Sequence, residues 1–339
     1  MGRSQSIAGM RRLLRRQEFW LALLTLLLGV GIGLANPAFL SLANLFDLCQ
    51  SSTVTGLFAM GVLIVLVSGG IDVSFAAIGA FSMYVTSKVL LAWGFQGSAA
   101  IAFLLAAAIG ASLGLFNALF IAFFRLPTLI VTLGSASLFR GFLLAFIGTT
   151  IVNNLPEGMI RFSKLTLWER TLPGGTTAGL SSSFLWLIGA ALFVGFLLQW
   201  TMLGRGIYAM GGSLVAAERA GFRIRRQQLF IYGLAGLLSG VAGLVHACMM
   251  RNANPFDLVG MELNVIAAVV LGGASITGGR GTVLGTVLGV LLIVTINNSL
   301  ILLNIPSYWQ KVVTGGVILV STGITARTSG RRIHGVGLC

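Results

Sequence analysis

The chain has 339 residues, of which 56% are hydrophobic and only 9% are charged, and it contains 46 glycines. This composition excludes an ordinary soluble domain, because too few polar residues remain to cover a water-facing surface. The net charge of +14 does not indicate a nucleic-acid-binding protein, since the basic residues are dispersed between apolar runs rather than gathered with aromatic residues on one face.

Apolar runs long enough to cross a hydrocarbon core of about 30 Å follow one another along the chain. They are 19–36, 53–68, 73–93, 98–124, 127–148, 183–203, 227–250, 282–303 and 307–326, and the shorter run 262–273 makes ten. The short run covers only about 18 Å if helical, so it is expected to be re-entrant or tilted into a thinned region. We therefore predict an all-α polytopic membrane protein with about ten membrane segments.

The basic residues predict which side of the membrane each loop faces. With an even number of crossings both termini lie on one side, and 15 of the 22 Lys and Arg residues then fall on that side. Lys and Arg accumulate in short cytoplasmic loops, so both termini are predicted to be cytoplasmic. The predicted organisation is a basic N-terminus (1–18), a single transmembrane domain (19–326) and a basic tail (327–339).

Two extramembrane segments stand out between the apolar runs. The outer segment 149–182 mixes turn-forming residues with Phe162 and Trp168, which predicts a short helix or a hairpin on the membrane surface. The inner segment 204–226 holds five arginines, one glutamate and no apolar run. We expect this second segment to be a water-exposed loop that meets a soluble partner.

Asp72 lies between two apolar runs, although an Asp at the centre of a bilayer costs about 2.5–3.5 kcal/mol. One interpretation places Asp72 and Ser74 at a helix break that lines a translocation pathway, which Gly69 and Gly70 would allow. The other makes Asp72 or Ser74 the N-terminal cap of the next helix. The two interpretations are compatible.

Four other polar residues within apolar runs need partners. Arg140 must find a carboxylate or a carbonyl inside the bundle, or extend to an interface, and we predict a structural pairing. Glu262 precedes a short apolar run, where a negative charge favours a helix start. Asn297 and Asn298 either line a pathway or hydrogen-bond between helices.

Small residues spaced four apart predict close contacts between helices. This spacing is found in three sets, which are expected to lie on one face of a helix each: Gly29 with Gly33, Gly236 with Gly240, and Gly281 with Gly285 and Gly289.

The motifs of common catalytic sites are missing from the sequence. It contains no GxxxxGK[ST] loop to hold ATP phosphates, no HExxH motif, and three cysteines without metal-ligand spacing. We therefore predict no catalytic residue, no metal site and no cofactor bound by this chain. Any ATP energy must come from another polypeptide.

Four blocks occur in order along the chain. They are SGGIDVSFAAIGA (68–80), LPTLIVTLGSASLFRG (126–141), GRGIYAMGGSLVAAERAGF (204–222) and ELNVIAAVVLGGASITGGRGTVLGTVLGV (262–290). Together they resemble the permease subunits of bacterial ABC importers for simple sugars, of the ribose, xylose and autoinducer-2 type. The resemblance covers about residues 40 to 326.

The resemblance implies a subunit of the bacterial inner membrane that works with several partners. These are a second permease, identical or homologous, two cytoplasmic ATPase subunits that hold ATP and Mg, and a periplasmic sugar-binding protein. It also implies that a cytoplasmic loop docks on the ATPase as a short coupling helix. The matching residues here are Gly212, Ser213, Ala216, Ala217, Glu218, Arg219 and Gly221.

The predicted function is ATP-driven import of a monosaccharide or a similar polyol-like solute by alternating access. On this interpretation the chain is a transport subunit and not an enzyme. The alternative is an ion- or proton-coupled secondary transporter, for which Asp72 and Glu262 are the plausible intramembrane carboxylates. An intramembrane enzyme is disfavoured because no pair of a nucleophile and a base is found.

Overall fold

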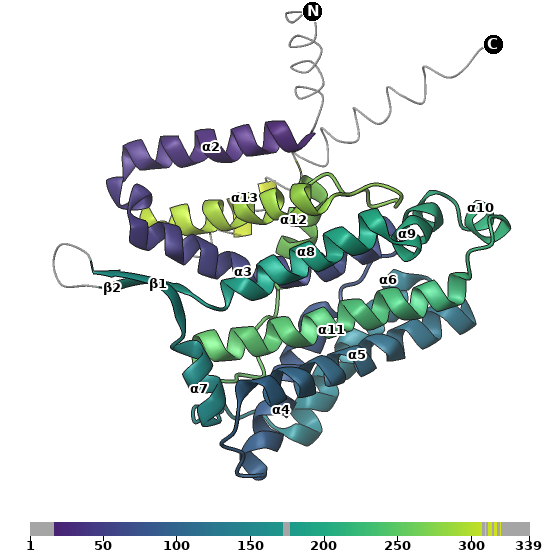
Figure 1. Ribbon diagram of the computed structural model, residues 1–339, viewed down its shortest axis with the longest axis horizontal. Helices are drawn as coiled ribbons and strands as arrows, with labels where there is room; N and C mark the ends of the chain where they lie inside the picture. Colours follow the sequence, from purple (N-terminus) through teal and green to yellow (C-terminus); the bar gives the residue numbers. More distant parts are fainter. Residues whose placement is uncertain are drawn as a thin grey trace, which may run out of the picture.

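The computed structural model describes residues 17–171 and 177–306, together with positions 309, 311–313, 315, 316 and 319. In this part of the chain long helices lie side by side in a bundle (Figure 1). They are α2 (Gln17–Ala35), α3 (Leu42–Val67), α4 (Phe75–Ala92), α5 (Ala99–Phe124), α6 (Thr128–Phe142), α8 (Phe184–Trp200), α11 (Ile224–Met250) and α13 (Val283–Leu302). The shorter elements are η1 (Pro37–Leu40), the π-helical turn η2 (Leu143–Ile147), α7 (Glu157–Ser163), β1 (Thr166–Thr171), β2 (Thr177–Ser181), α9 (Met202–Gly212), α10 (Leu214–Arg219) and α12 (Met261–Leu271).

The helices confirm a helical polytopic membrane protein. Among the described residues, seven helical segments are long and apolar enough to cross a membrane, and α8 with α9 would make an eighth span that is bent by 75°. The short run predicted at 262–273 is α12, with 11 residues. Most of the run predicted at 307–326, most of the N-terminus 1–18 and all of the tail 327–339 lie outside the described residues.

Helix α3 forms the centre of the bundle. Its start at Leu42 lies 11 residues before the predicted run 53–68, because Ser41 caps the helix by accepting a hydrogen bond from the Asn44 backbone N–H at 3.2 Å. From Ser52 to Val67 every residue of α3 is buried. Such a helix is apolar on all sides because protein, and not lipid or water, surrounds it.

Helices α5 and α11 make the most extensive helix contact among the described residues. A Cβ atom added to Gly236 would lie 2.3 Å from the Gly110 carbonyl oxygen, and one added to Gly240 would lie 2.2 Å from the Ala106 carbonyl oxygen. The two backbones therefore touch without side chains between them, as the spacing of Gly236 and Gly240 predicts. Gly285 and Gly289 on α13 contact α12 and the residue after it in the same way. Gly281 does not share their helical face as predicted, because it precedes the first residue of α13 and has φ +156°.

The chain from α12 to α13 passes along the bundle instead of turning back. Glu262, in the first turn of α12, contacts Arg140 near the end of α6. Gly278 lies against Gly69 and Gly211. Gly69 belongs to the loop 68–74, which also contacts Thr128, the first residue of α6. Gly278 therefore lies at the level where α6 begins. The 12 residues from Thr128 to Arg140 correspond to about 18 Å of helix. Thus 11 helical residues and the irregular segment 272–282 together cover much of the depth of the bundle.

The segment 149–182 contains both structures that its sequence allows. It forms the short helix α7 and then an antiparallel hairpin of β1 and β2, paired between Thr166↔Ser181 and Thr171↔Thr177. The hairpin extends beyond the helices at the end of the bundle opposite α10 (Figure 1). All six residues of β1 are exposed.

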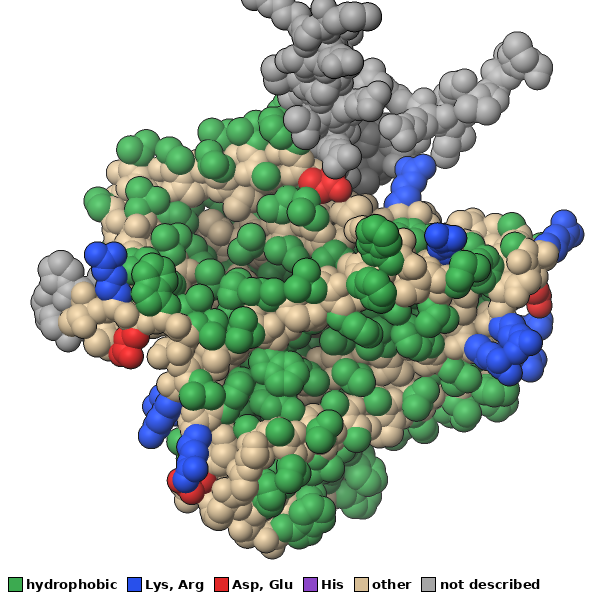
Figure 2. Space-filling view, in the orientation of Figure 1, with side chains coloured by type: hydrophobic (Ala, Val, Ile, Leu, Met, Phe, Trp, Pro, Cys, Tyr) green, Lys and Arg blue, Asp and Glu red, His purple; other side chains and the backbone are tan. Residues whose placement is uncertain are grey.

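The surface fits a lipid environment. Apolar side chains cover the sides of the helices, and the Lys and Arg side chains gather at the two ends, near α9 to α11 and near α7 and the hairpin (Figure 2). On α5, for example, Leu104 is 70% exposed and Phe124 is 63% exposed. An apolar surface of this extent is stable only where lipid or another apolar partner covers it.

Candidate functional site: a terminal helix and two polar contacts

The segment 204–226 is not the fully water-exposed loop that its charges predict. Its first part belongs to α9, where Gly204, Gly206, Ile207 and Met210 are buried. This correction has a physical cause: α9 is amphipathic, and its glycines let it pack closely, since a Cβ atom on Gly204 would lie 2.2 Å from the Leu197 carbonyl oxygen. The arginines of the segment, Arg205, Arg219, Arg223, Arg225 and Arg226, are exposed as expected.

The second part forms α10, a short helix at the tip of the bundle (Figure 1). Ser213 caps it, because its hydroxyl accepts a hydrogen bond from the Ala216 backbone N–H at 3.3 Å. Gly221 follows the helix with φ +88°, a conformation that favours glycine. The residues predicted for coupling therefore form one structural unit: Gly212, Ser213, Ala216, Glu218, Arg219 and Gly221 are exposed, and Ala217 is buried beneath them.

Two residues of α10 were missed by the sequence reasoning. Leu214 is 52% exposed and Val215 is 60% exposed, at the first turn of the helix. Since α10 lies at the end of the bundle where arginines gather, beyond the apolar sides, lipid does not account for these side chains. The available signal was two adjacent apolar residues within an otherwise polar stretch.

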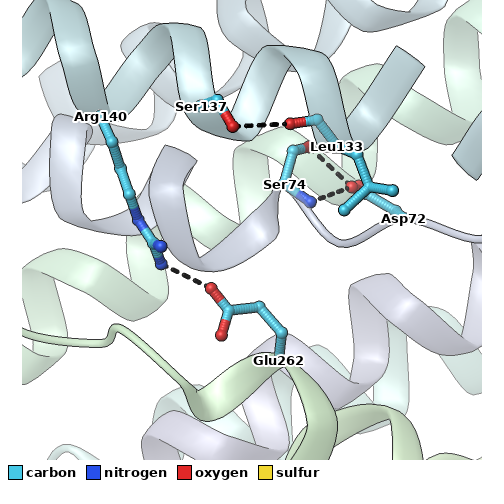
Figure 3. Close-up of polar contacts among 6 residues, drawn as sticks. All are labelled: Asp72, Ser74, Leu133, Ser137, Arg140 and Glu262. Carbon is cyan, nitrogen blue, oxygen red and sulfur yellow. Dashed lines mark hydrogen bonds and ion pairs between the residues drawn. The ribbon is translucent and has the colours of Figure 1, made fainter. Parts of the chain in front are cut away.

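Asp72 lies in the break between α3 and α4, and its side chain holds that break in shape. Its Oδ1 atom accepts hydrogen bonds from the Ser74 backbone N–H at 2.7 Å and from the Ser74 hydroxyl at 2.6 Å (Figure 3). Ser74 is the N-cap position of α4, yet its side chain makes no bond to that helix. Asp72 thus caps the turn, and Ser74 supports Asp72.

Side chains of two further helices extend this buried network. The Asn117 side chain of α5 donates to the Ser74 hydroxyl at 2.8 Å. The Thr128 hydroxyl of α6 accepts from the Ile71 backbone N–H at 3.0 Å. Asp72 is 3% exposed and Ser74 is fully buried. The irregular backbone is therefore surrounded by protein, which is the condition for non-helical chain at membrane depth.

Arg140 and Glu262 form an ion pair with each other. The guanidinium of Arg140 donates to the Glu262 Oε1 atom at 2.5 Å, between α6 and the first turn of α12 (Figure 3). The two side chains are 32% and 17% exposed. Glu262 thus lies in the first turn of α12, and Arg140 has a carboxylate partner.

The predicted pathway residues are not all brought together. Asn297 and Asn298 lie on α13, which packs against α2, α3, α8 and α12. The Asp72 network instead joins α5 and α6. Both asparagines are half-buried, and the Asn298 Oδ1 atom is enclosed without a hydrogen-bond partner.

Comparison with known proteins adds to this geometry. Residues 44–322 match the family described as the permease component of branched-chain amino acid transport systems. The chain is 32% identical to the ribose import permease protein of Escherichia coli (strain K12) over 323 residues, which is 94% of this chain and 97% of that protein. It is 36% identical to the L-arabinose ABC transporter permease protein of Azospirillum brasilense over 298 residues, 87% of this chain and 84% of the relative. It is 34% identical to the autoinducer 2 import system permease protein of Enterobacter sp. (strain 638) over 312 residues, 91% and 87% respectively. No solved structure matches the chain.

Proposed function

The chain belongs to the family of permease components of branched-chain amino acid transport systems, and from this premise we propose that it is the membrane-spanning subunit of an ATP-driven importer for a monosaccharide or a similar polyol-like solute. The proposal includes a binding protein that delivers the solute and a separate ATPase that supplies the energy. The similarity to ribose, L-arabinose and autoinducer 2 permeases over at least 87% of this chain carries the choice of solute class.

The form of α10 supports an ATPase partner. It is a capped helix with exposed Leu214 and Val215, and it is fastened to the bundle through buried Ala217. A small amphipathic helix can insert its apolar side chains into a groove of a soluble protein. We infer that the unit 212–221 docks on the ATPase at the cytoplasmic face. The hairpin and α7 then face the periplasm, where the binding protein would deliver its solute.

Transport would follow alternating access between two permease subunits, each like this chain. The partner is either a second copy or a homologous permease. Both would reside in the bacterial inner membrane, with ATP and Mg on the ATPase subunits. On this proposal the Asp72 break and α13 are candidates for surfaces that the solute passes.

The test is uptake by vesicles that contain the purified complex of this chain with its ATPase and binding protein. We expect uptake of a radiolabelled sugar, from a panel including ribose and L-arabinose, only when the ATPase has ATP and Mg. Omitting the binding protein should abolish it. A panel of branched-chain amino acids provides the control for the solute class, because the family description includes such transport systems.

Two results would contradict the proposal. Uptake of branched-chain amino acids and of none of the sugars would overturn the solute class. Uptake driven by a pH or sodium gradient in vesicles without ATP would instead support a secondary transporter.

A further inference from the structure

Three stretches that are distant in sequence meet backbone to backbone beside α10. They are the end of α3 at 67–69, the last turn of α9 at 208–211, and the loop before α13 at 277–281. The Gly279 N–H donates to the Val67 carbonyl oxygen at 2.9 Å, and the Tyr208 hydroxyl donates to the Gly281 carbonyl oxygen at 2.7 Å. We call this junction the glycine clasp.

The clasp leaves no room for side chains at its centre. A Cβ atom on Gly211 would lie 1.9 Å from the Val67 carbonyl oxygen and 2.3 Å from the Gly279 nitrogen. One on Gly278 would lie 2.7 Å from the Gly211 carbonyl oxygen and 2.8 Å from the Gly69 Cα atom. Distances under 3.0 Å are too short for any real Cβ contact. The three segments therefore touch through backbone atoms, which have no rotamers to absorb a displacement.

The clasp connects directly to α10 on one side. Ser213 is the residue that ends α9 and also caps α10, so no flexible linker separates the two helices. Gly211 and Tyr208 lie in the last turn of α9, two and five residues before Ser213. The start of α10 thus lies within one or two helical turns of the clasp.

On its other side the clasp meets the break between α3 and α4. Val67 is the last residue of the buried helix α3, and Gly69 begins the segment that contains Asp72. The same segment is bound to Thr128 of α6, while Asp72 and Ser74 connect it to Asn117 of α5. Moving the end of α3 therefore acts on the polar network in the interior of the bundle.

We propose that the glycine clasp positions α9 as a lever that transmits a displacement of α10 to the end of α3 and to the Asp72 break. The proposal rests on the proposed docking of α10 on an ATPase. Tyr208, Gly211 and Gly278 are positioning residues on this account, since they act through the contacts between α9, the end of α3 and the loop before α13. Packed interfaces with discrete arrangements transmit such displacements, whereas a flexible loop would absorb them.

The chain offers a matched pair of variants for the test. Tyr208→Phe removes only the hydrogen bond to Gly281, and Tyr84→Phe removes an equivalent bond to the Thr150 carbonyl oxygen, of 2.8 Å, at the opposite end of the bundle. In vesicles with the full complex we expect Tyr208→Phe to raise the number of ATP molecules hydrolysed per solute by about two- to thirtyfold, the range of coupling effects for residues of a coupling network. Tyr84→Phe should leave this ratio unchanged.

Gly211→Ala should have a stronger effect than Tyr208→Phe, because the added methyl group meets two backbones. Gly189→Ala is its control, since a Cβ atom on Gly189 has open space in α8. If both complexes assemble, an equal number of ATP molecules hydrolysed per solute in Tyr208→Phe and Tyr84→Phe would overturn the proposal. If Gly211→Ala fails to fold, the comparison of Tyr208→Phe with Tyr84→Phe still tests the proposal.

Hydrogen–deuterium exchange of the purified permease separates this inference from the proposed function. Tyr208→Phe should increase exchange in a peptide covering 275–282, which includes the Gly279 N–H bonded to Val67, and Tyr84→Phe should not. Unchanged exchange in Tyr208→Phe would contradict the clasp. Failure of the wild-type complex to couple uptake to ATP would instead contradict the proposed function. Increased exchange in Tyr208→Phe would then show that the clasp exists as a structural junction, without a role in coupling.

Discussion

Arg140 and Glu262 are 122 positions apart in sequence, and their contact joins α6 to the start of α12. We predict that Arg140→Ala lowers the free energy of unfolding by about 1.5–3 kcal/mol, the contribution of hydrogen bonds to charged groups. The loss arises because Glu262 then remains largely buried without its partner. Thermal unfolding in detergent, followed by tryptophan fluorescence, measures the effect.

The control for this pair is the double variant Arg140→Ala with Glu262→Gln, which is compared with each of the two single variants. Removing both charges should recover part of the stability, since no unpaired charge remains. If the effects of the single variants simply add in the double variant, the two residues do not stabilise each other.

Asp72 allows a sharper distinction between charge and hydrogen bonding. Because its Oδ1 atom accepts both bonds from Ser74, Asp72→Asn can keep them, whereas Asp72→Ala cannot. We expect Asp72→Ala to lower the free energy of unfolding by about 1–3 kcal/mol and to reduce uptake. Asp72→Asn should remain close to wild type in both measurements. Equal loss of uptake in the two variants would show that the negative charge itself is required.

At this scale the sequence predicted that a residue needs a partner or begins a helix, but not which residue it contacts. The need of Arg140 for a partner follows from its place in an apolar run, and Glu262 was already assigned to a helix start. Their mutual contact was not predictable, because it depends on how α6 and α12 pack. Likewise Asp72 and Ser74 were both candidates for a cap, and only the fold reveals that Ser74 binds Asp72 and not α4.

Among the elements, α5 and α11 contact each other through glycines. We predict that Gly240→Leu destabilises the protein by about 1–3 kcal/mol or more, the usual effect of overpacking. The reason is that its Cβ atom would lie 2.2 Å from the Ala106 carbonyl oxygen. Gly134→Leu is the control, because a Cβ atom there meets nothing within 4 Å. Comparable unfolding temperatures for the two variants would contradict the close α5–α11 contact.

The short helix α10 yields a prediction about binding. If Leu214 and Val215 insert into an ATPase groove, replacing either by Ser should weaken the ATPase complex about tenfold or more, since each loses a buried apolar side chain. Leu165→Ser is the matched control, because Leu165 is 56% exposed at the opposite end of the bundle. Affinities are measured with purified permease in detergent. An unchanged affinity in both α10 variants would exclude these side chains from the interface.

Element boundaries within the apolar runs were predictable to within a few residues, as for 98–124 and α5, because a run that faces lipid must be helical to satisfy its backbone. The helix α9 was not predictable from charge alone. The arginines of the segment 204–226 suggested a water-exposed loop, while the packing of α9 depends on Gly204 and Gly206, whose close contacts exist only in the folded chain. The start of α3 was missed because polar residues such as Asn44 are buried there.

For the whole molecule, four sequence blocks were enough to predict the family, and the family match over residues 44–322 confirms it together with the similarity to the ribose and L-arabinose permeases. The blocks also coincide with the places where the interior is irregular: the Asp72 break, the start of α6, the α9–α10 unit, and α12 with its following loop. The glycine clasp joins three of these four blocks. The blocks that resemble relatives are thus the parts of the chain where helices break, begin or meet in the interior of the bundle.

The path of the chain through 261–282 leads to a prediction about membrane sidedness. If this segment crosses the membrane, Val259 before α12 and Arg280 before α13 lie on opposite sides, and Arg280 shares the side of Arg219 on α10. All three positions are exposed. In a variant without native cysteines, single cysteines at these positions should therefore react differently with an impermeant maleimide: Val259→Cys in right-side-out vesicles, and Arg280→Cys and Arg219→Cys in inside-out vesicles.

Labelling of Val259→Cys and Arg280→Cys from the same side would mean that the segment is re-entrant. In that case α13 and everything after it would have the inverse orientation, and the 15 basic residues counted on the cytoplasmic side would be divided between the two faces, against the usual bias.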